Sequence, residues 1–289
     1  MTARTQKKSV RGTAKKLGTT KPSFKPKIAS RKPSTVTNLI SLNRTTETRR
    51  SPNVNNLTRR MGLMSIPRPI ETRGTIMGTN RNNTLRVQLP RTLVTELEGI
   101  YIGSASPTHG RMEFAGLIEC TFDVNYANFT TPTIRTNYQM TSVHLPERTM
   151  MTKMTYHTHP SPPAAPGSTY TSIPSGPDFN AYIRTHRNGV IEANIILEQQ
   201  GMYVIDVLRP INRDIGEDIF NAIIEKIQSA GGINYTVEDS ILVFNLNIGR
   251  WKRFMNNTLD PFLVRQYGVS IKFYKWNELP QVRISSLHR

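Results

Sequence analysis

The chain has 289 residues, with 38 Lys and Arg against 20 Asp and Glu, which gives a formal net charge of +18. Its single cysteine, Cys120, excludes an intrachain disulfide framework and any site built from several thiolates. No apolar run is long enough for a membrane span, and the basic, polar N-terminus lacks the apolar core of a secretory signal. We therefore expect an intracellular protein, in the cytoplasm, the nucleus or both, without a membrane partner.

Almost all of the excess positive charge lies near the N-terminus. Residues 1–85 contain 19 Lys and Arg and two acids, which leaves 19 basic and 18 acidic residues for 86–289. Residues 1–84 contain too little apolar surface to offset the entropy of ordering, so we expect a disordered basic arm and linker. Spaced cations suit contacts with phosphates, which makes nucleic acid or another polyanion the expected partner of residues 1–60. A tail that only improves solubility is the alternative.

From Leu85 onward the sequence has the periodicities of regular structure. Alternating residues at 85–89 predict a strand, and Pro90 then opens an apolar pattern typical of a helix that ends near Gly103. The order of the elements predicts an α/β domain over residues 85–231, a sheet with helices on its faces. The further elements, in chain order, are expected to be strands at 112–122, 133–138 and 150–157, a helix at 178–187, strands at 190–197 and 202–208, and a helix at 215–230.

Residues 232–289 are expected to form a small C-terminal α/β extension. It contains strand candidates at 240–244 and 269–276. Trp251 and Trp276 are expected to close a small core of this extension rather than to stack on nucleic-acid bases.

Two histidines and one aspartate have the spacing of metal ligands. His157 and His159 follow one another at i and i+2, so both imidazoles leave the same side of a strand. Downstream, Ser175-Gly-Pro-Asp178 has the form of a helix start, which places Asp178 in the first turn. Two nitrogens and one oxygen would leave a fourth position open to water, which is the pattern of catalytic zinc.

Such a site also needs a carboxylate that is not a ligand, because a proton must leave the reacting water. Glu113 is preferred, since it begins an expected buried strand where an unpaired carboxylate is costly. The alternative interpretation is that Glu113 is paired with an arginine, such as Arg111 or Arg135. The other glutamates that enter the comparison are Glu96, Glu98, Glu119 and Glu147.

Three separated segments together resemble the JAMM (JAB/MPN) zinc metalloproteases, with their pattern Glu, then His-x-His-Pro, then Ser-x-x-Asp. The resemblance covers about residues 85–230 and implies a mixed β-sheet flanked by helices. It also implies zinc bound by His157, His159 and Asp178. The segments are Met112-Glu-Phe-Ala-Gly-Leu117, His157-Thr-His-Pro160 and Ser175-Gly-Pro-Asp178.

The same resemblance implies roles for two further residues. Glu113 would be the general acid/base, and Ser175 would support the oxyanion of the reaction. Ser175 can also serve only as the N-cap of the following helix. Glu96, in the segment Glu96-Leu-Glu-Gly99 of the first expected helix, is the alternative catalytic acid.

The spacing departs from this family between the last two segments. Ser161–Pro174 has fourteen residues where the family usually has six. Its proline and serine content predicts a surface loop, which can be inserted at little entropic cost and can act as a lid or an exosite.

The resemblance implies a zinc-dependent isopeptidase that removes ubiquitin or a ubiquitin-like protein from lysine. The alternative from the sequence is a non-catalytic scaffold of the MPN type, or a nucleic-acid-associated structural protein that uses the basic arm.

Overall fold

The computed structural model describes residues 72–79, 84–106, 110–136, 147–149, 152–161, 169–188, 193–231, 233–238, 241–245 and 247–285. Nearly all of the expected basic arm, and residues 162–168 of the expected loop, lie outside these ranges. All described residues belong to one compact unit within Gly62–Arg289. None of the helices in the described ranges has the length and apolar character that a membrane crossing requires.

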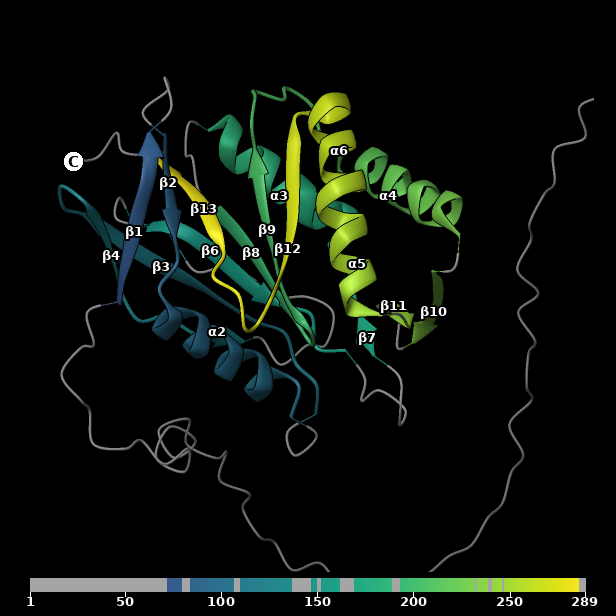
Figure 1. Ribbon diagram of the computed structural model, residues 1–289, viewed down its shortest axis with the longest axis horizontal. Coiled ribbons are helices and arrows are strands. Elements are labelled where there is room, and N and C mark those ends of the chain that lie inside the picture. The colour runs from purple at the N-terminus through teal and green to yellow at the C-terminus, as the bar shows by residue number, and fades with distance from the viewer. Residues whose placement is uncertain are drawn as a thin grey trace, which may run out of the picture. The chain divides into compact units, whose positions relative to one another are not determined.

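The described strands form one large mixed sheet and one small sheet (Figure 1). The large sheet has the order β12-β9-β8-β6-β3-β4-β1-β2-β13, with β5 beside β3, and β6 runs parallel to β8. Its strands are β1 (Thr72–Thr79), β2 (Thr84–Gln88), β3 (Phe114–Phe122), β4 (Tyr126–Phe129), β5 (Arg135–Thr136), β6 (Thr152–Thr158), β8 (Ala193–Glu198), β9 (Gly201–Val207), β12 (Val269–Lys275) and β13 (Gln281–Ser285). The small sheet has the order β10-β11-β7, from β7 (Tyr170–Thr171), β10 (Asn234–Glu238) and β11 (Ile241–Asn245).

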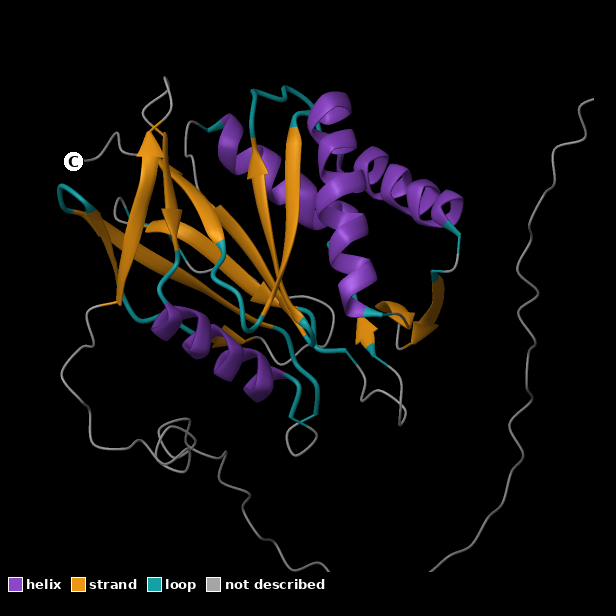
Figure 2. Ribbon diagram, in the orientation of Figure 1, coloured by secondary structure: helices purple, strands orange, loops and turns teal. Residues whose placement is uncertain are grey.

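Helices cover both faces of the large sheet (Figure 2). One face packs against α2 (Arg91–Ser104), which we call the α2 face. The other, the α3 face, packs against α3 (Gly176–Arg187), α4 (Gly216–Ala230), α5 (Ile248–Phe254) and α6 (Asp260–Tyr267), with a π-helical segment at Met255–Leu259. The predicted mixed sheet flanked by helices is therefore confirmed.

Each face has its own apolar core. Successive residues of a strand point to opposite sides, so Ile195 of β8 enters the core under α2 and Ile196 enters the core under α3. Both residues are completely buried. A strand that is buried on both faces reads as a continuous apolar run, which is why β8 was predictable from the sequence.

The helix α2 follows its predicted apolar pattern. Pro90 is its N-cap residue, and Ala105 follows its last turn. The helix predicted near 90–103 is confirmed, with the expected face against the sheet. Its buried residues are Leu93, Val94, Leu97, Ile100, Tyr101 and Ser104.

The ends of the described chain complete the large sheet. β1 precedes the boundary expected at residues 84 and 85, and it pairs with both β2 and β4. From the expected extension 232–289, β12 pairs with β9 and β13 pairs with β2. The expected boundaries therefore do not separate these strands from the sheet. Trp251 is likewise buried in the core of the α3 face rather than in a core of its own.

The segment from α5 to α6 covers the outer edge of β12. Asn256 forms a pair of hydrogen bonds with the backbone of Phe273, and Asp260 accepts from the backbone N–H of Ile271 at 3.0 Å. These side chains satisfy an edge that would otherwise be open to pairing. The sequence did not predict helices here because asparagine and threonine are weak helix formers. Burial of neighbours such as Met255 outweighs that propensity.

Candidate metal centre

The two histidines lie at the end of β6, in the middle of the large sheet. His157 is the penultimate residue of β6, and the backbone N–H of His159 donates to the carbonyl of Leu197 at 2.8 Å. This bond continues the strand direction beyond Thr158, so both imidazoles project from the sheet on its α3 face. The predicted same-side arrangement is confirmed by their Nε2 atoms, which lie 2.9 Å apart.

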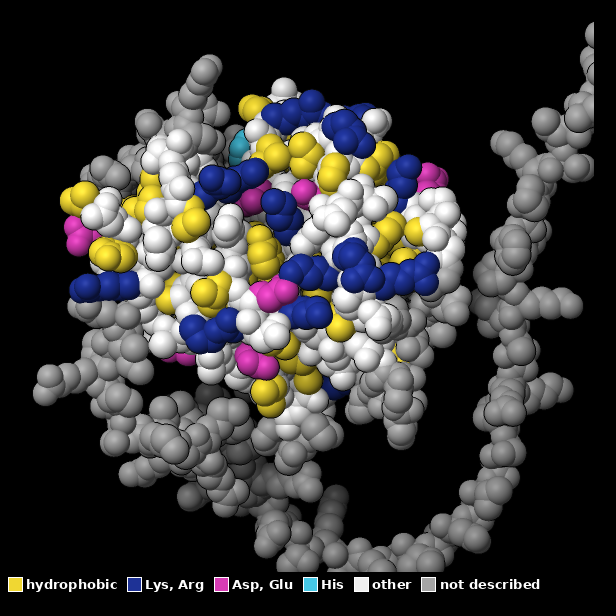
Figure 3. Space-filling model, viewed as in Figure 1, with side chains coloured by type: hydrophobic (Ala, Val, Ile, Leu, Met, Phe, Trp, Pro, Cys, Tyr) yellow, Lys and Arg dark blue, Asp and Glu magenta, His cyan; other side chains and the backbone are white. Residues whose placement is uncertain are grey.

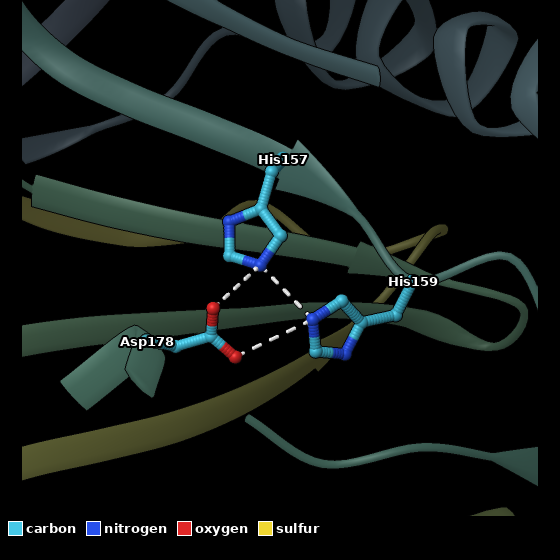
Figure 4. Close-up of side chains that lie close together, drawn as sticks. All are labelled: His157, His159 and Asp178. Carbon is cyan, nitrogen blue, oxygen red and sulfur yellow. Dashed lines mark hydrogen bonds and ion pairs between the residues drawn. The ribbon is translucent and has the colours of Figure 1, made fainter. Parts of the chain in front are cut away.

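Asp178 completes the cluster from the first turn of α3 (Figure 4). Its Oδ1 lies 3.2 Å from Nε2 of His157, and its Oδ2 lies 3.5 Å from Nε2 of His159. Ligand atoms held tetrahedrally at about 2.05 Å from an ion stand about 3.3 Å apart. The observed separations bracket that value, so the three side chains can hold one metal ion.

The Asp178 carboxyl is held in its charged form. Burial by itself would raise its pKa, but the neighbouring His157 and His159 outweigh burial and hold the pKa well below the usual range. A carboxylate must be deprotonated to bind a metal, so this environment prepares Asp178 as a ligand.

Ser175 caps α3 and holds Asp178 at the same time. Its hydroxyl accepts from the backbone N–H of Asp178 at 3.4 Å, and Oδ2 of Asp178 accepts from the backbone N–H and the hydroxyl of Ser175, each at 2.7 Å. This reciprocal arrangement is a capping box. The N-cap interpretation of Ser175 is confirmed, and its part in binding an oxyanion stays a prediction.

A close contact between α3 and α4 fixes the start of α3. The backbone N–H of Gly216 donates to Oδ1 of Asn180 at 2.7 Å. A Cβ atom at Gly216 would stand only 1.9 Å from the carbonyl oxygen of Gly176, so the chain needs glycine there. The small residue lets the two helices begin side by side, with Asp178 in the first turn of one of them.

Tyr182, one turn beyond Asp178, contacts the second nitrogen of His157. Its hydroxyl lies 3.1 Å from Nδ1 of His157, and the side chain is almost completely buried. Burial and the nearby carboxylates of Asp178 and Glu113 raise the tyrosine pKa well above its usual value. Metal-binding histidines commonly use their other ring nitrogen in this way, which fixes the ring. The spacing of four residues from Asp178 was the signal in the sequence that could have revealed Tyr182.

Glu113 lies on the same face as the cluster. It immediately precedes β3, where Ala115 pairs with His157, and the backbone N–H of Phe114 donates to Thr158 Oγ1 at 2.9 Å. Continuing this antiparallel register places Glu113 opposite His159, because opposed residues share a face.

The surroundings of Glu113 suit a proton carrier. The residue is 8% exposed. Burial raises the pKa of its carboxyl to about 7, with a smaller lowering by His159 and a smaller raising by Asp178. A carboxyl with a pKa near neutrality can both accept and release a proton there.

Glu96, the alternative carboxylate, lies on α2, and α2 packs against the opposite face of the sheet. The arrangement therefore places Glu113, and not Glu96, on the face that carries His157 and His159. The Oε2 atom of Glu96 is buried without a hydrogen-bond partner among the described residues, and burial raises the pKa of this carboxyl.

The prediction that 161–174 is a surface loop is wrong for its last four residues. Thr171 to Pro174 are buried, and Thr171 pairs with Phe244 of β11. The residues that join this segment to α3 are therefore part of the packed interior. The sequence could not show this, because the partner strand follows about seventy residues later.

A second buried carboxyl, Glu198, was missed by sequence reasoning. It ends β8 beside the cluster's end of the sheet and is completely buried. Burial raises its pKa to about 8, against a smaller lowering by neighbouring groups that include Thr171 and the backbone N–H of Gln200, which donates to Oε1 at 3.0 Å. A single Glu at the end of an apolar run, before the turn at Gln199 and Gln200, was the available signal.

Comparisons of the chain with models of protein families, with curated proteins and with solved structures found no match. The residues themselves therefore define the class of site. It is a buried His-His-Asp cluster at the end of a central strand that can hold a metal ion.

Proposed function

We propose that this protein is a zinc-dependent isopeptidase that releases ubiquitin or a ubiquitin-like protein from lysine. The observation that carries the proposal is the convergence of His157, His159 and Asp178 beside the buried carboxyl of Glu113. The resemblance of the sequence segments to JAMM metalloproteases supplies the substrate class.

The donor set favours zinc. Two imidazole nitrogens and one carboxylate oxygen are common zinc ligands, and three protein ligands leave a position for water, as in catalytic zinc sites. A zinc ion bound there would supply a Lewis acid that acidifies water and polarises a carbonyl group.

Glu113 moves the proton in this mechanism. Its carboxylate accepts a proton from the attacking water as the new carbon–oxygen bond forms. It then returns that proton to the lysine amine as the carbon–nitrogen bond breaks. The pKa of about 7 suits both transfers near neutral pH.

Ser175 has a supporting place in the same mechanism. Its hydroxyl donates to Asp178 at 2.7 Å, so it orients one ligand through the capping box. Because it stands at the N-terminus of α3, the local dipole also favours negative charge that develops on the substrate carbonyl oxygen.

The experiment combines zinc analysis with cleavage of a ubiquitin chain and of a ubiquitin-like conjugate. We expect one zinc per wild-type chain, and His157→Ala should lose it. Glu113→Gln should keep the zinc and lose cleavage by a factor of about 10² to 10⁴. Glu96→Gln is the matched control, which should keep both. Wild-type protein without bound metal would contradict the proposal, and loss of cleavage in Glu96→Gln would reassign the acid/base.

The charge of the N-terminal part favours a second candidate, a scaffold or nucleic-acid-associated structural protein. Residues 1–85 have 19 Lys and Arg against two acids. On the face in Figure 3, by contrast, basic and acidic side chains are interspersed over the described residues.

We expect deletion of residues 1–60 to abolish salt-sensitive binding to nucleic acid and to leave zinc binding intact. An unchanged salt dependence after the deletion would exclude the polyanion interpretation. Zinc binding without cleavage of either conjugate would favour the scaffold.

A further inference from the structure

A chain of buried hydrogen bonds joins α5 to the segment that leads into α3. The indole N–H of Trp251 donates to the Tyr203 hydroxyl at 2.9 Å, and that hydroxyl donates to the carbonyl of Ser172 at 2.6 Å. The Thr171 hydroxyl lies 3.1 Å from the same Tyr203 oxygen. All four residues are at most 1% exposed. Trp251 belongs to α5, Tyr203 to β9, and Ser172 follows directly after β7; Figure 1 labels these three elements.

The segment that receives these bonds reaches the metal centre within a few residues. Ser172 is followed by buried Ile173 and Pro174, and then by Ser175, which caps α3 and binds Asp178. Its backbone position therefore sets where the carboxylate stands relative to the two histidines on β6.

Glu198, completely buried at the end of β8, approaches the same segment from another side. Its Oε1 accepts from the backbone N–H of Gln200 at 3.0 Å. Thr171 and Ser172 lie close enough to this carboxyl to lower its pKa, against the larger raising by burial. The end of β8 also binds the strand that carries the histidines, because the Leu197 carbonyl receives the backbone N–H of His159.

Hydrogen bonds fix position more narrowly than apolar packing does. A buried polar group left without its partner costs about 1–3 kcal/mol, so the network disfavours any shift of Ser172 that would break it. An apolar contact in its place would be nondirectional and would tolerate sliding.

We propose that Tyr203 and Trp251 are positioning residues for the metal centre, which act through Ser172 on Ser175 and Asp178. The proposal rests on the proposed function in that the cluster binds a metal. It assigns α5, which follows the core of the expected metalloprotease domain, a part in building the site.

The experiment compares Tyr203→Phe and Trp251→Phe with the control Tyr274→Phe in the full chain. Tyr274, on the neighbouring strand β12, is a partly buried tyrosine that packs against the core of the α2 face. Tyr203→Phe and Tyr274→Phe keep their ring packing, whereas Trp251→Phe also loses part of the buried indole ring. Two quantities are measured: amide hydrogen exchange of residues 172–178 without metal, and the Kd for zinc.

We expect faster exchange across residues 172–178 in Tyr203→Phe and a zinc Kd about tenfold weaker, as for other groups that orient ligands. Trp251→Phe should show the same changes to a smaller extent, and it serves as the test if Tyr203→Phe does not fold. Tyr274→Phe should leave both quantities as in the wild type.

Wild-type exchange at residues 172–178 in folded Tyr203→Phe or Trp251→Phe would overturn the inference. A wild-type chain that binds no zinc would instead contradict the proposed function, and the exchange measurement would still decide this inference. Faster exchange in the control as well would also overturn it, because the effect would then be general loosening.

Discussion

The two faces of β6 have opposite chemistry within one strand. Tyr156 points into the apolar core under α2, whereas His157, the next residue, points to the His157, His159 and Asp178 cluster under α3, which can hold a metal ion. Both are almost completely buried. Apolar packing on the α2 face sets the position of the strand. On the α3 face the strand carries polar groups, which are costly to bury unless they bind a metal ion or a hydrogen-bond partner. The position of His157 therefore depends on packing against the α2 face, which carries none of the three cluster residues.

The largest expected change in the free energy of unfolding comes from a substitution in the core of the α2 face. Leu97→Ala in α2 should lower the free energy of unfolding by about 2–5 kcal/mol, because it leaves a cavity in a fully buried position. The zinc Kd of the protein that remains folded should be unchanged. Denaturant unfolding and zinc titration measure the two quantities. A weaker zinc Kd in folded Leu97→Ala would show that the two faces are not independent.

The second prediction tests the close contact between α3 and α4 on the α3 face. Gly216→Ala should lower the free energy of unfolding by about 1–3 kcal/mol and weaken zinc binding, since its Cβ would meet the carbonyl oxygen of Gly176.

Gly99→Ala on α2 is the matched control. A Cβ there meets nothing within 4 Å, so stability should stay equal or rise by up to about 1 kcal/mol. Equal behaviour of the two variants would contradict the close approach of α3 and α4.

A third prediction concerns the pH dependence of stability that arises from the buried carboxyl of Glu198. The pKa of Glu198 is raised by burial from 4.5 to about 8. Between these values the unfolded chain releases a proton that the folded chain keeps. The free energy of unfolding should therefore fall as pH rises, by at most about 1.4 kcal/mol per pH unit from this residue.

Glu198→Gln should reduce that slope, and urea unfolding between about pH 5 and about pH 8 measures it. An identical slope in the variant and the wild type would show that this carboxyl is ionised in the folded protein.

The smallest expected change comes from removing the hydroxyl of Tyr182, which contacts one ring nitrogen of His157. Tyr182→Phe keeps the packing of the ring and removes the hydroxyl that lies 3.1 Å from Nδ1 of His157. We expect a zinc Kd about tenfold weaker, with little change in unfolding. Competition with a zinc chelator measures the Kd. An unchanged Kd would mean that the hydroxyl does not orient His157.

Local patterns accounted for much of the fold and for the ligand set. The helical spacing from Leu93 to Tyr101 predicted α2 and its buried face. The i and i+2 histidines and the Ser175 cap predicted three groups on suitable elements. These features depend on residues within one or two turns of each other, so the sequence contains them directly.

The elements that were missed depend on distant partners. β1 has little apolar alternation and exists between β2 and β4, while β7 pairs with β11. The segment at 248–267 becomes helical on the edge of β12 despite weak local propensity. The local sequence does not show these partners, because strand pairing and edge packing join residues that are far apart in the chain.

By itself, the sequence determined which chemical groups are present and how each is held locally: two imidazoles on a strand, and a carboxylate in a capped helix turn. Only the tertiary structure decided that these groups converge, and that Glu113 rather than Glu96 shares their face. The reason is geometric. A local pattern fixes the direction of a side chain relative to its own element, whereas the register of β3 on β6 and the docking of α3 fix the distances between elements.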